Sequence, residues 1–239
     1  MNGFDSHNPA CVAIIPARGG SKRIPGKNIR PFAGRPMIEY AVALAQSSGL
    51  FARIVVSTDS DEVATLAEQA GAEVPFRRPI ELADDHATTA AVLEHALDAL
   101  DARGQYDFAC CIYPATPFTT PDDLRAGLAY VADDGAASSF AVTGFAAPIS
   151  RAMERRPDGS LAMVQPEHRD TRSQDLPETF HDAGQFYWIP VAGFLDAPVL
   201  LTDRSRGVVF ERWRAHDIDT EEDWMRAEAI YQTLKQGAA

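Results

Sequence analysis

The sequence predicts an α/β fold in which a mostly parallel, Rossmann-like sheet is flanked by helices and extended by a β-rich arm. Short continuous apolar runs, which are typical of buried parallel strands, alternate with helical patterns from residue 12 to about residue 142. Gly and Pro separate these segments. Between Ala146 and Gln185 the alternation stops, and Arg, Pro, Asp and Gly become frequent. We therefore interpret residues 146–185 as an excursion from the sheet.

The elements follow one another in a regular order. Residues 12–15 form the first predicted strand, and the stretch from Pro16 to Pro36 is too rich in Gly and Pro for a regular element. The Ala-rich residues 37–47 then predict a helix that ends before Gly49. Later strands are expected at residues 53–57, 74–76, 108–113, 136–142 and 208–212, and later helices at residues 61–70, 88–102, 121–131 and 221–234.

Capping residues mark some of the helix ends. Ser60 is a candidate N-cap of the second helix, and Gly71 is a candidate stop signal after it. His86, Thr88 and Thr89 precede the third helix. We favour a capping role for these three residues over a position beside a nucleotide.

The chain is expected to form a single domain over residues 11–239, preceded by a disordered segment at residues 1–10. That segment lacks the basic stretch and apolar run of a signal peptide. No apolar run approaches the ~20 residues needed to cross a bilayer, so we expect a cytoplasmic protein without membrane contact. Cys11, Cys110 and Cys111 lie in apolar runs, which favours buried thiols over disulfides or a metal site.

The basic residues are unevenly distributed. The net charge of −12 argues against a nucleic-acid-binding surface, which is expected to be basic. Between Asp5 and Glu39, however, there is no acidic residue. The basic residues of this stretch are Arg18, Lys22, Arg23, Lys27, Arg30 and Arg35. A basic segment on an acidic protein indicates a specific polyanion site, and a polyphosphate fits.

The glycine-rich segment at residues 14–28 follows the first strand directly. Its glycines allow the backbone to approach a phosphate closely, and Arg18, Lys22 and Lys27 supply positive charge. The segment is not a Walker A motif, because Ser21 stands where that motif needs its first glycine. A basic surface loop is the alternative, but it would not need this glycine content immediately after a buried strand.

A second candidate site is the pair of aspartates in the segment His216–Thr220. In an extended backbone Asp217 and Asp219 project to the same side, where two carboxylates repel each other unless a cation lies between them. Mg²⁺ prefers one or two carboxylates together with phosphate oxygens and water. The alternative, that Asp219 caps the helix starting near Glu221, stays open.

A third polar cluster lies at the end of the excursion and just beyond it. Arg172, Gln174, Gln185 and Tyr187 suit an acidic sugar, because its carboxylate needs a cation and its hydroxyls need polar groups beside a flat apolar surface. The alternative is that Arg172 forms a surface ion pair with Asp175.

The segment at residues 14–28 resembles the signature loop of the CMP-sialic acid synthetase family, nucleotidyltransferases that activate sialic acid and related sugars with CTP. The resemblance covers nearly the whole chain from residue 12 to residue 234. It continues through Val56–Asp59, Arg78–Pro79, Leu82–Asp85 and Tyr113–Phe118. The strings Arg172–Pro177 and Asp182–Trp188 are similar to the pseudaminic acid branch, and the second departs from the Asn-Gly-Ala-Ile-Tyr-like string of sialic acid enzymes.

The resemblance implies roles for individual residues. Catalytic roles are implied for Arg18, Lys22, Lys27, Asp217 and Asp219, with the two aspartates as ligands of Mg²⁺. The nucleotide is expected at Ala17, Arg18, Gly19, Ser21, Lys22, Lys27, Asn28, Arg78 and Asp85. The sugar is expected at Tyr113, Thr116, Arg172, Gln174, Gln185 and Tyr187. A homodimer formed through residues 146–185 is also implied.

These expectations combine into a cytidylyltransferase that transfers CMP from CTP to the anomeric hydroxyl of pseudaminic acid and releases pyrophosphate, which activates the sugar for glycosylation of surface glycans or flagellin. The alternatives are the same reaction on N-acetylneuraminic, legionaminic or 3-deoxy-octulosonic acid, a CTP-binding domain without activity, and a nucleotidyltransferase for neutral sugar 1-phosphates. The last would need a second phosphate site, for which only Arg172 is available. No side chain stands out as a general base or as the group that selects cytosine.

Overall fold

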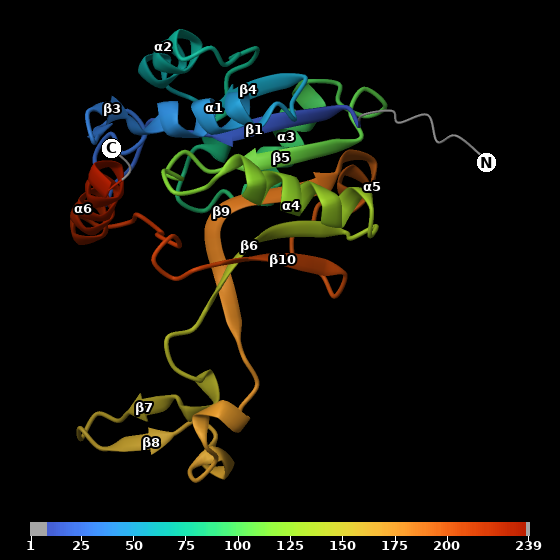
Figure 1. The fold of residues 1–239 in the computed structure, drawn as a ribbon. Coiled ribbons are helices and arrows are strands. Elements are labelled where there is room, and N and C mark those ends of the chain that lie inside the picture. The colour runs from blue at the N-terminus through green and yellow to red at the C-terminus, as the bar shows by residue number, and fades with distance from the viewer. Residues whose placement is uncertain (1–8, 238–239) are drawn as a thin grey trace.

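The computed structural model of the chain describes residues 9–237 and is built around a six-stranded sheet (Figure 1). The strands are β1 (Cys11–Pro16), β4 (Arg53–Ser57), β5 (Phe108–Ile112), β6 (Ser138–Gly144), β9 (Phe180–Pro190) and β10 (Ser205–Phe210). Their order is β10-β6-β9-β5-β1-β4. β1 is parallel to β4 and β5, and β10 is parallel to β6, whereas β9 is antiparallel to both of its neighbours. The predicted fold class is confirmed.

Helices cover both faces of the sheet. They are α1 (Met37–Ser48), α2 (Asp61–Gln69), α3 (Thr89–Ala99), α4 (Pro121–Ala132) and α5 (Val191–Asp196). A further helix, α6 (Glu221–Gly237), packs in a separate cluster with Ile24 and Phe32. Apolar side chains of α1, α2 and α4 pack in one cluster with the sheet, and those of α3 and α5 pack in a second. In the part of the chain that the structure describes, no helix combines the length and apolar character needed to cross a membrane.

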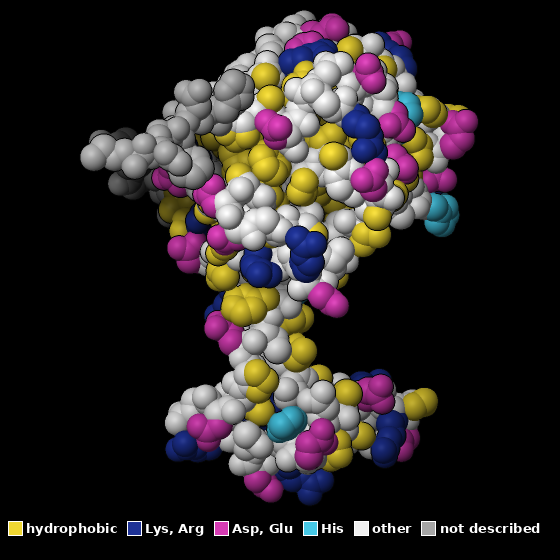
Figure 2. All heavy atoms as spheres, turned by 90° about the vertical axis from the view of Figure 1, so that its right-hand side faces the viewer, with side chains coloured by type: hydrophobic (Ala, Val, Ile, Leu, Met, Phe, Trp, Pro, Cys, Tyr) yellow, Lys and Arg dark blue, Asp and Glu magenta, His cyan; other side chains and the backbone are white. Residues whose placement is uncertain are grey.

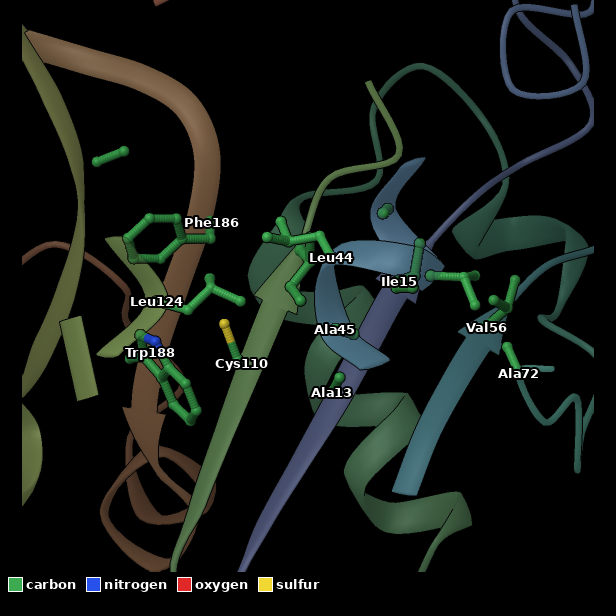
Figure 3. Close-up of a cluster of buried hydrophobic side chains, with 14 of the residues drawn as sticks. Ala13, Ile15, Leu44, Ala45, Val56, Ala72, Cys110, Leu124, Phe186 and Trp188 are labelled. Atoms are coloured by element: carbon green, nitrogen blue, oxygen red, sulfur yellow. The ribbon is translucent and has the colours of Figure 1, made fainter. Parts of the chain in front are cut away.

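The continuous apolar run of β1 follows from burial on both faces. Ala13 and Ile15 belong to the cluster beneath α1, and Val12 and Ile14 belong to the cluster beneath α3. All four side chains are fully buried. Figure 3 shows Ala13 and Ile15 in the cluster that also contains Leu44 of α1. This core fixes the end of β1, from which the glycine-rich loop departs.

Several predicted helix ends are confirmed. The Ser60 hydroxyl accepts a hydrogen bond from Val63 N at 3.4 Å, and Gly71 follows α2 with a φ of +93°. The Thr88 hydroxyl accepts from Ala91 N at 3.2 Å and caps α3, which starts one residue later and ends earlier than predicted.

Two short segments differ from the prediction. The strand expected at residues 74–76 is absent from the described chain, where Glu73 forms only an isolated bridge with Val55. Pro75 lacks the N–H that would extend the pairing. Conversely, β2 (Pro31–Phe32) and β3 (Arg35–Pro36) form a small hairpin where no regular element is predicted. Its turn residues Ala33 and Gly34 both have positive φ, as a tight hairpin turn requires.

β9 is the main element that the sequence does not predict. It lies between β5 and β6 and pairs antiparallel with both. Its first three residues are exposed, and its later side chains are mostly buried. The predicted excursion at residues 146–185 therefore overlaps the sheet, because β9 already begins at Phe180.

The predicted β-rich arm is present between β6 and β9. β7 (Met153–Arg155) and β8 (Leu161–Met163) form an antiparallel pair far from the sheet (Figure 1). Figure 2 shows this arm as a separate lobe on a narrow neck. Exposed apolar side chains of the arm and neck are Phe145, Ile149, Met153, Leu161, Val164 and Phe180. A chain segment of this kind buries little of its own apolar surface.

Gly127 of α4 provides a test of the packing. A Cβ there would lie 2.7 Å from Trp188 Cδ1 and 2.8 Å from Phe186 Cε2, and both rings are buried. Overpacking costs typically 1–3 kcal/mol, so we expect Gly127→Ala to lower the free energy of unfolding by about 1–2 kcal/mol despite the better helix propensity of Ala. Urea denaturation measures the change.

The matched control is Gly193→Ala in α5, where an added Cβ meets nothing within 4 Å. This variant should be as stable as the wild type or slightly more so, because Ala favours the helix. Equal stability of the two variants would contradict the packing described for α4.

Candidate active site

A cavity of about 870 Å³ lies at the carboxyl ends of β1 and β5. This is the edge at which open α/β sheets bind ligands. Its walls come from the glycine-rich loop, the segment before α3, the ends of β5 and β9 that meet there, and the segment before α6. Predicted site residues that line it are Arg18, Ser21, Lys22, Lys27, Asn28, Arg78, Asp85, Tyr113, Tyr187, Asp217 and Asp219.

Hydrogen bonds hold the glycine-rich loop in a closed shape. The side-chain amide of Asn28, which is buried, donates to the carbonyl of Arg18 at 2.9 Å. Lys27 Nζ donates to the carbonyl of Ile218 at 2.8 Å. Gly26 has a φ of +63° and accepts hydrogen bonds from two later backbone amides at 2.9 Å. Lys27 thereby joins the loop to the segment that precedes α6, although the two are far apart in sequence.

Ala17 and Gly19 are predicted nucleotide-binding residues whose backbone amides are engaged within the protein. Ala17 N donates to the carbonyl of Ser57 at 3.0 Å, and Gly19 N donates to Asp59 Oδ1 at 2.9 Å. A Cβ on Gly19 would lie 2.7 Å from Ser60 Cβ. Glycine is therefore required here by contact with the start of α2. Neither residue lines the cavity.

Asp85 forms ion pairs with two cations of the loop. Its Oδ1 lies 2.7 Å from Arg18 Nη2, and its Oδ2 lies 2.6 Å from Lys22 Nζ. The hydrogen bonds from Lys22 and Arg18 hold the pKa of the Asp85 carboxyl below its ordinary value. Both carboxylate oxygens of Asp85 are thus occupied by loop cations.

Asp219, one of the aspartate pair, meets the other two cations of the loop. Asp219 forms ion pairs with Arg23 at 2.9 Å and with Lys27 at 3.3 Å. Burial raises the pKa of the Asp217 carboxyl, and the negative charge of Asp219 raises it further. Both aspartates line the cavity.

The helix that follows does not use Asp219 as its cap. The Thr220 hydroxyl accepts from Asp223 N at 3.2 Å, and Asp223 Oδ2 accepts from Thr220 N at 2.9 Å. This reciprocal pair has the form of a capping box. The alternative that Asp219 caps the helix is therefore wrong, and its carboxylate is available to the cavity.

The two aspartates fit a Mg²⁺ site in which a substrate supplies the remaining ligands. A divalent cation between them would relieve the repulsion that raises the pKa of Asp217. Within residues 9–237 there is no group of three or more His, Cys, Asp or Glu side chains that could hold a metal ion alone. Mg²⁺ commonly binds through one or two carboxylates, waters and substrate phosphates, and this donor set matches.

Helix α6 is fastened to the glycine-rich loop. Arg30 Nη1 donates to both oxygens of Glu221, at 2.6 and 2.8 Å, and its guanidinium lies 4.6 Å from the ring of Trp224. Ala33 N, in the β2–β3 turn, donates to Glu228 Oε1 at 2.6 Å. These contacts set the position of the aspartate pair relative to the loop.

A polar aromatic wall forms another side of the cavity. The hydroxyls of Tyr113 and Thr89 lie 2.5 Å apart, and the Tyr113 ring meets the Tyr187 ring edge-on, with centroids 5.8 Å apart. The Tyr187 hydroxyl donates to Asp182, which also accepts from Gly184 N at 2.8 Å. Burial raises the pKa of both tyrosines, so their hydroxyls stay protonated near neutral pH.

Arg78 lines the cavity but is engaged by the protein. Its guanidinium donates to Ser57 Oγ at 3.1 Å, to the Ser57 carbonyl at 2.5 Å and to the Leu82 carbonyl at 3.5 Å. Burial lowers the pKa of Arg78 to about 10, so it stays charged at neutral pH. It holds β4 and the segment before α3 together, and its contact with a nucleotide stays a prediction.

Thr116 and Gln185 are predicted sugar-binding residues that the structure does not bring to the cavity. The Thr116 hydroxyl donates to the Tyr113 carbonyl at 3.0 Å, and Thr116 is buried. The Gln185 amide, also buried, bonds to the Thr119 hydroxyl at 3.1 Å and to the His216 carbonyl at 3.2 Å. Both side chains satisfy internal polar groups.

Arg172 and Gln174 lie in the arm, outside the cavity. Arg172 pairs with Asp175 at 2.8 Å, and 71% of its side chain is exposed. The surface ion pair considered from the sequence is therefore present in this chain. A sugar contact of Arg172 or Gln174 in the cavity would need a second copy of the chain.

Four polar or charged side chains without a predicted binding role also line the cavity: Arg23, Asp84, Thr89 and Asp182. The favoured capping role of Thr89 is wrong, because Thr88 caps α3 and the Thr89 hydroxyl contacts Tyr113. The basic composition of the loop is a signal from which Arg23 could have been predicted as a site residue. Asp182 could not be placed because β9 is not predicted.

Comparisons with known proteins show the family and the fold to which the chain is similar. Residues 12–188 match the model of the family described as Cytidylyltransferase. The chain is 37% identical to a pseudaminic acid cytidylyltransferase of Campylobacter jejuni over 95% of this chain and 98% of that protein. It is 42% identical to a CMP-N,N'-diacetyllegionaminic acid synthase of Legionella pneumophila over 48% of this chain and 50% of that protein. The fold resembles a CMP:2-keto-3-deoxy-manno-octonic acid synthetase solved in complex with CTP, with a TM-score of 0.69, 17% identity, and coverage of 94% and 99% of the two chains.

The raised pKa of Asp217 predicts a pH-dependent stability difference. The ionised carboxylate is less stable in the folded than in the unfolded chain, so it reduces stability above its pKa and has no effect when protonated in both states. In EDTA at pH 7.5 we expect Asp217→Asn to be more stable than the wild type. The advantage should shrink as the pH is lowered toward 4, as urea denaturation can measure.

Asp122→Asn serves as the control, because this exposed carboxylate is paired with Arg125 in α4. It should show no gain at pH 7.5. A loss of stability in Asp217→Asn at pH 7.5 would contradict the charge repulsion assigned to the aspartate pair.

Proposed function

The chain belongs to the Cytidylyltransferase family, and on this premise we propose that it transfers CMP from CTP to the anomeric hydroxyl of an acidic nine-carbon sugar, most specifically pseudaminic acid. Pyrophosphate is the second product. The supporting observation is that the cationic loop and the aspartate pair face one cavity and meet directly, since Lys27 Nζ lies 3.3 Å from Asp219 Oδ1.

The proposed reaction is a direct displacement at the α-phosphorus of CTP. The bond from the sugar oxygen to phosphorus forms as the bond from phosphorus to the bridging oxygen of pyrophosphate breaks, and the hydroxyl proton leaves to solvent. Such transfers depend mostly on positioning and charge stabilisation. Arg18, Lys22 and Lys27 carry the positive charge that offsets the charge growing on pyrophosphate. Ser21 and Asn28 bind the phosphates or hold the loop in the shape that surrounds them.

Mg²⁺ is the proposed cofactor, held by Asp217 and Asp219. When bound, it supplies Lewis-acid polarisation of a phosphate oxygen. Lys27 and Arg23, which pair with Asp219 in the ligand-free chain, are then available to phosphate oxygens. The proposed ligands therefore compete with cations of the same cavity.

Pseudaminic acid is favoured as the sugar because the pseudaminic acid cytidylyltransferase of Campylobacter jejuni is similar over nearly its whole length. Legionaminic acid is the main alternative, since the Legionella pneumophila synthase matches about half of this chain. N-acetylneuraminic and 3-deoxy-octulosonic acids are the other candidates. Tyr113 and Tyr187 provide a flat aromatic surface for such a sugar. A cytoplasmic location also stays a prediction.

We also propose a homodimer in which the arm of one protomer reaches the cavity of its partner. The carboxylate of the sugar needs a cation, but the described cations that line the cavity belong to the loop or, in the case of Arg78, are held by Ser57. Arg172 lies on the arm with most of its side chain exposed. The exposed apolar residues of the arm would be covered in such a dimer.

A substrate panel tests the proposed function. Pyrophosphate release with CTP and Mg²⁺ should be fastest with pseudaminic acid among the four sugars named above and should need CTP among the nucleoside triphosphates. Asp219→Asn should lower kcat by about 100-fold or more while changing CTP affinity much less, because it removes a metal ligand. CTP binding without turnover on any of these sugars would favour the alternative of a binding domain. Full activity of Asp219→Asn would refute the metal assignment.

A complementation experiment tests the shared site. Arg172→Ala and Asp219→Asn should each be nearly inactive alone. Heterodimers contain one cavity with an intact Asp219 and an intact Arg172 from the partner arm. Random pairing of the co-expressed variants should therefore restore about a quarter of the wild-type activity, since a two-fold dimer has two equivalent sites. Activity of Arg172→Ala alone, or no recovery in purified heterodimers, would contradict the arm assignment.

A further inference from the structure

We propose that Asp85 is an intramolecular competitor of the nucleotide triphosphate for Arg18 and Lys22. In the ligand-free chain the Asp85 carboxylate occupies these cations, and polyphosphate binding exchanges it for phosphate oxygens. The inference rests on the proposed function, in which Arg18 and Lys22 hold the triphosphate. It goes beyond that function by assigning to Asp85 an ion pair that opposes binding of the triphosphate.

The geometry of Asp85 resembles that of a bridging phosphate. Its two oxygens contact two different cations, at 2.7 Å to Arg18 and 2.6 Å to Lys22. Those cations stand four residues apart on the loop and come together on this one carboxylate. A phosphate group offers oxygens of the same charge to the same donors. The two groups therefore compete for one set of hydrogen-bond donors.

The backbone around Asp85 holds its carboxylate over the loop. We call residues 80–87 the strap. Arg18 Nη1 donates to the Ala83 carbonyl at 3.4 Å, and Arg78 Nη1 donates to the Leu82 carbonyl at 3.5 Å. Asp84 Oδ1 accepts from the backbone amides of His86 and Ala87, both at 2.8 Å. Hydrogen bonds other than the ion pairs of Asp85 thus shape the strap, and two of them lie within the strap itself.

The ion pairs of Asp85 are weak enough to be exchanged. The exposed fractions of the side chains are 85% for Lys22, 36% for Asp85 and 31% for Arg18. Solvent screens such pairs, and exposed ion pairs contribute little to stability. A triphosphate carries several negative charges on adjacent groups and can displace a single carboxylate. A ligand without phosphate has nothing to exchange at these cations.

Asp219 forms a similar pair of contacts with Arg23 and Lys27, but it is proposed to exchange these cations for a metal ion and to stay in place when the nucleotide binds. A divalent cation replaces Lys27 and Arg23 at Asp219. Asp85 has no such partner among the described residues, because the cationic neighbours of its carboxylate are Arg18 and Lys22. Its charge therefore remains in the cavity as an opposing charge when the nucleotide binds.

The test is a binding experiment without metal or sugar. Isothermal titration in EDTA at constant ionic strength compares the wild type with Asp85→Asn, using CTP, inorganic tripolyphosphate and cytidine as ligands. Removing a competing exposed ion pair should tighten the binding of CTP and of tripolyphosphate by about three- to tenfold. Cytidine binding should not change. Circular dichroism and the unfolding midpoint report that the variant is folded.

Asp84→Asn is the matched control. It removes the same charge from the same strap, Asn can accept the same two backbone hydrogen bonds, and Asp84 makes no ion pair with Arg18 or Lys22. Asp84 lines the cavity but pairs with neither cation, and solvent screens its charge, so the variant should change CTP affinity by less than about twofold.

The outcomes separate the inference from the proposed function. Equal or weaker CTP binding by Asp85→Asn, or an equal gain in Asp84→Asn, would overturn the competition. A wild type that binds CTP neither in EDTA nor with Mg²⁺ would instead overturn the proposed function. In that case, tighter binding of tripolyphosphate by Asp85→Asn than by the wild type would still support competition at Arg18 and Lys22.

Discussion

The structure depends on controlling the repulsion among cations on one loop. Arg18, Lys22, Arg23 and Lys27 lie within ten residues, on a loop that a buried strand fixes at the sheet edge. Two carboxylates from distant parts of the chain divide these charges between them. Asp85 pairs with the first two cations, and Asp219 pairs with the last two. These two carboxylates offset about half of the positive charge of the loop in the ligand-free chain. In the proposed function, a triphosphate takes the place of Asp85 at its cations, and a divalent cation takes the place of Arg23 and Lys27 at Asp219.

The rest of the fold places those two carboxylates. The strap before α3 brings Asp85 over one side of the loop, where Arg78 anchors the strap to β4. The start of helix α6 brings the aspartate pair to Arg23 and Lys27, because the ion pair of Arg30 with Glu221 and the hydrogen bond of Ala33 with Glu228 hold the helix against the residues that follow the loop. A site made from segments about two hundred residues apart is thus held by short polar contacts over an aromatic cluster that includes Trp224.

The sequence predicts the parts of this arrangement whose signals are local. The buried run of β1 and the glycine-rich loop after it are visible as composition, and so is the aspartate pair. β9 is not predicted, because its residues continue from an irregular excursion and its antiparallel position depends on pairing with distant strands. Asp182, which lies on β9, is missed as a site residue for the same reason. Thr116 and Gln185 are polar residues near the site in sequence, but their side chains satisfy buried groups, which only the three-dimensional packing reveals.

The most direct measurement is a crystal of this protein soaked with CTP and Mn²⁺, which replaces Mg²⁺ and is located by its anomalous scattering. The central claim predicts one Mn²⁺ peak between Asp217 and Asp219, with the triphosphate running from that ion along Arg18 and Lys22. A triphosphate bound elsewhere, or a metal site away from both aspartates, would contradict it.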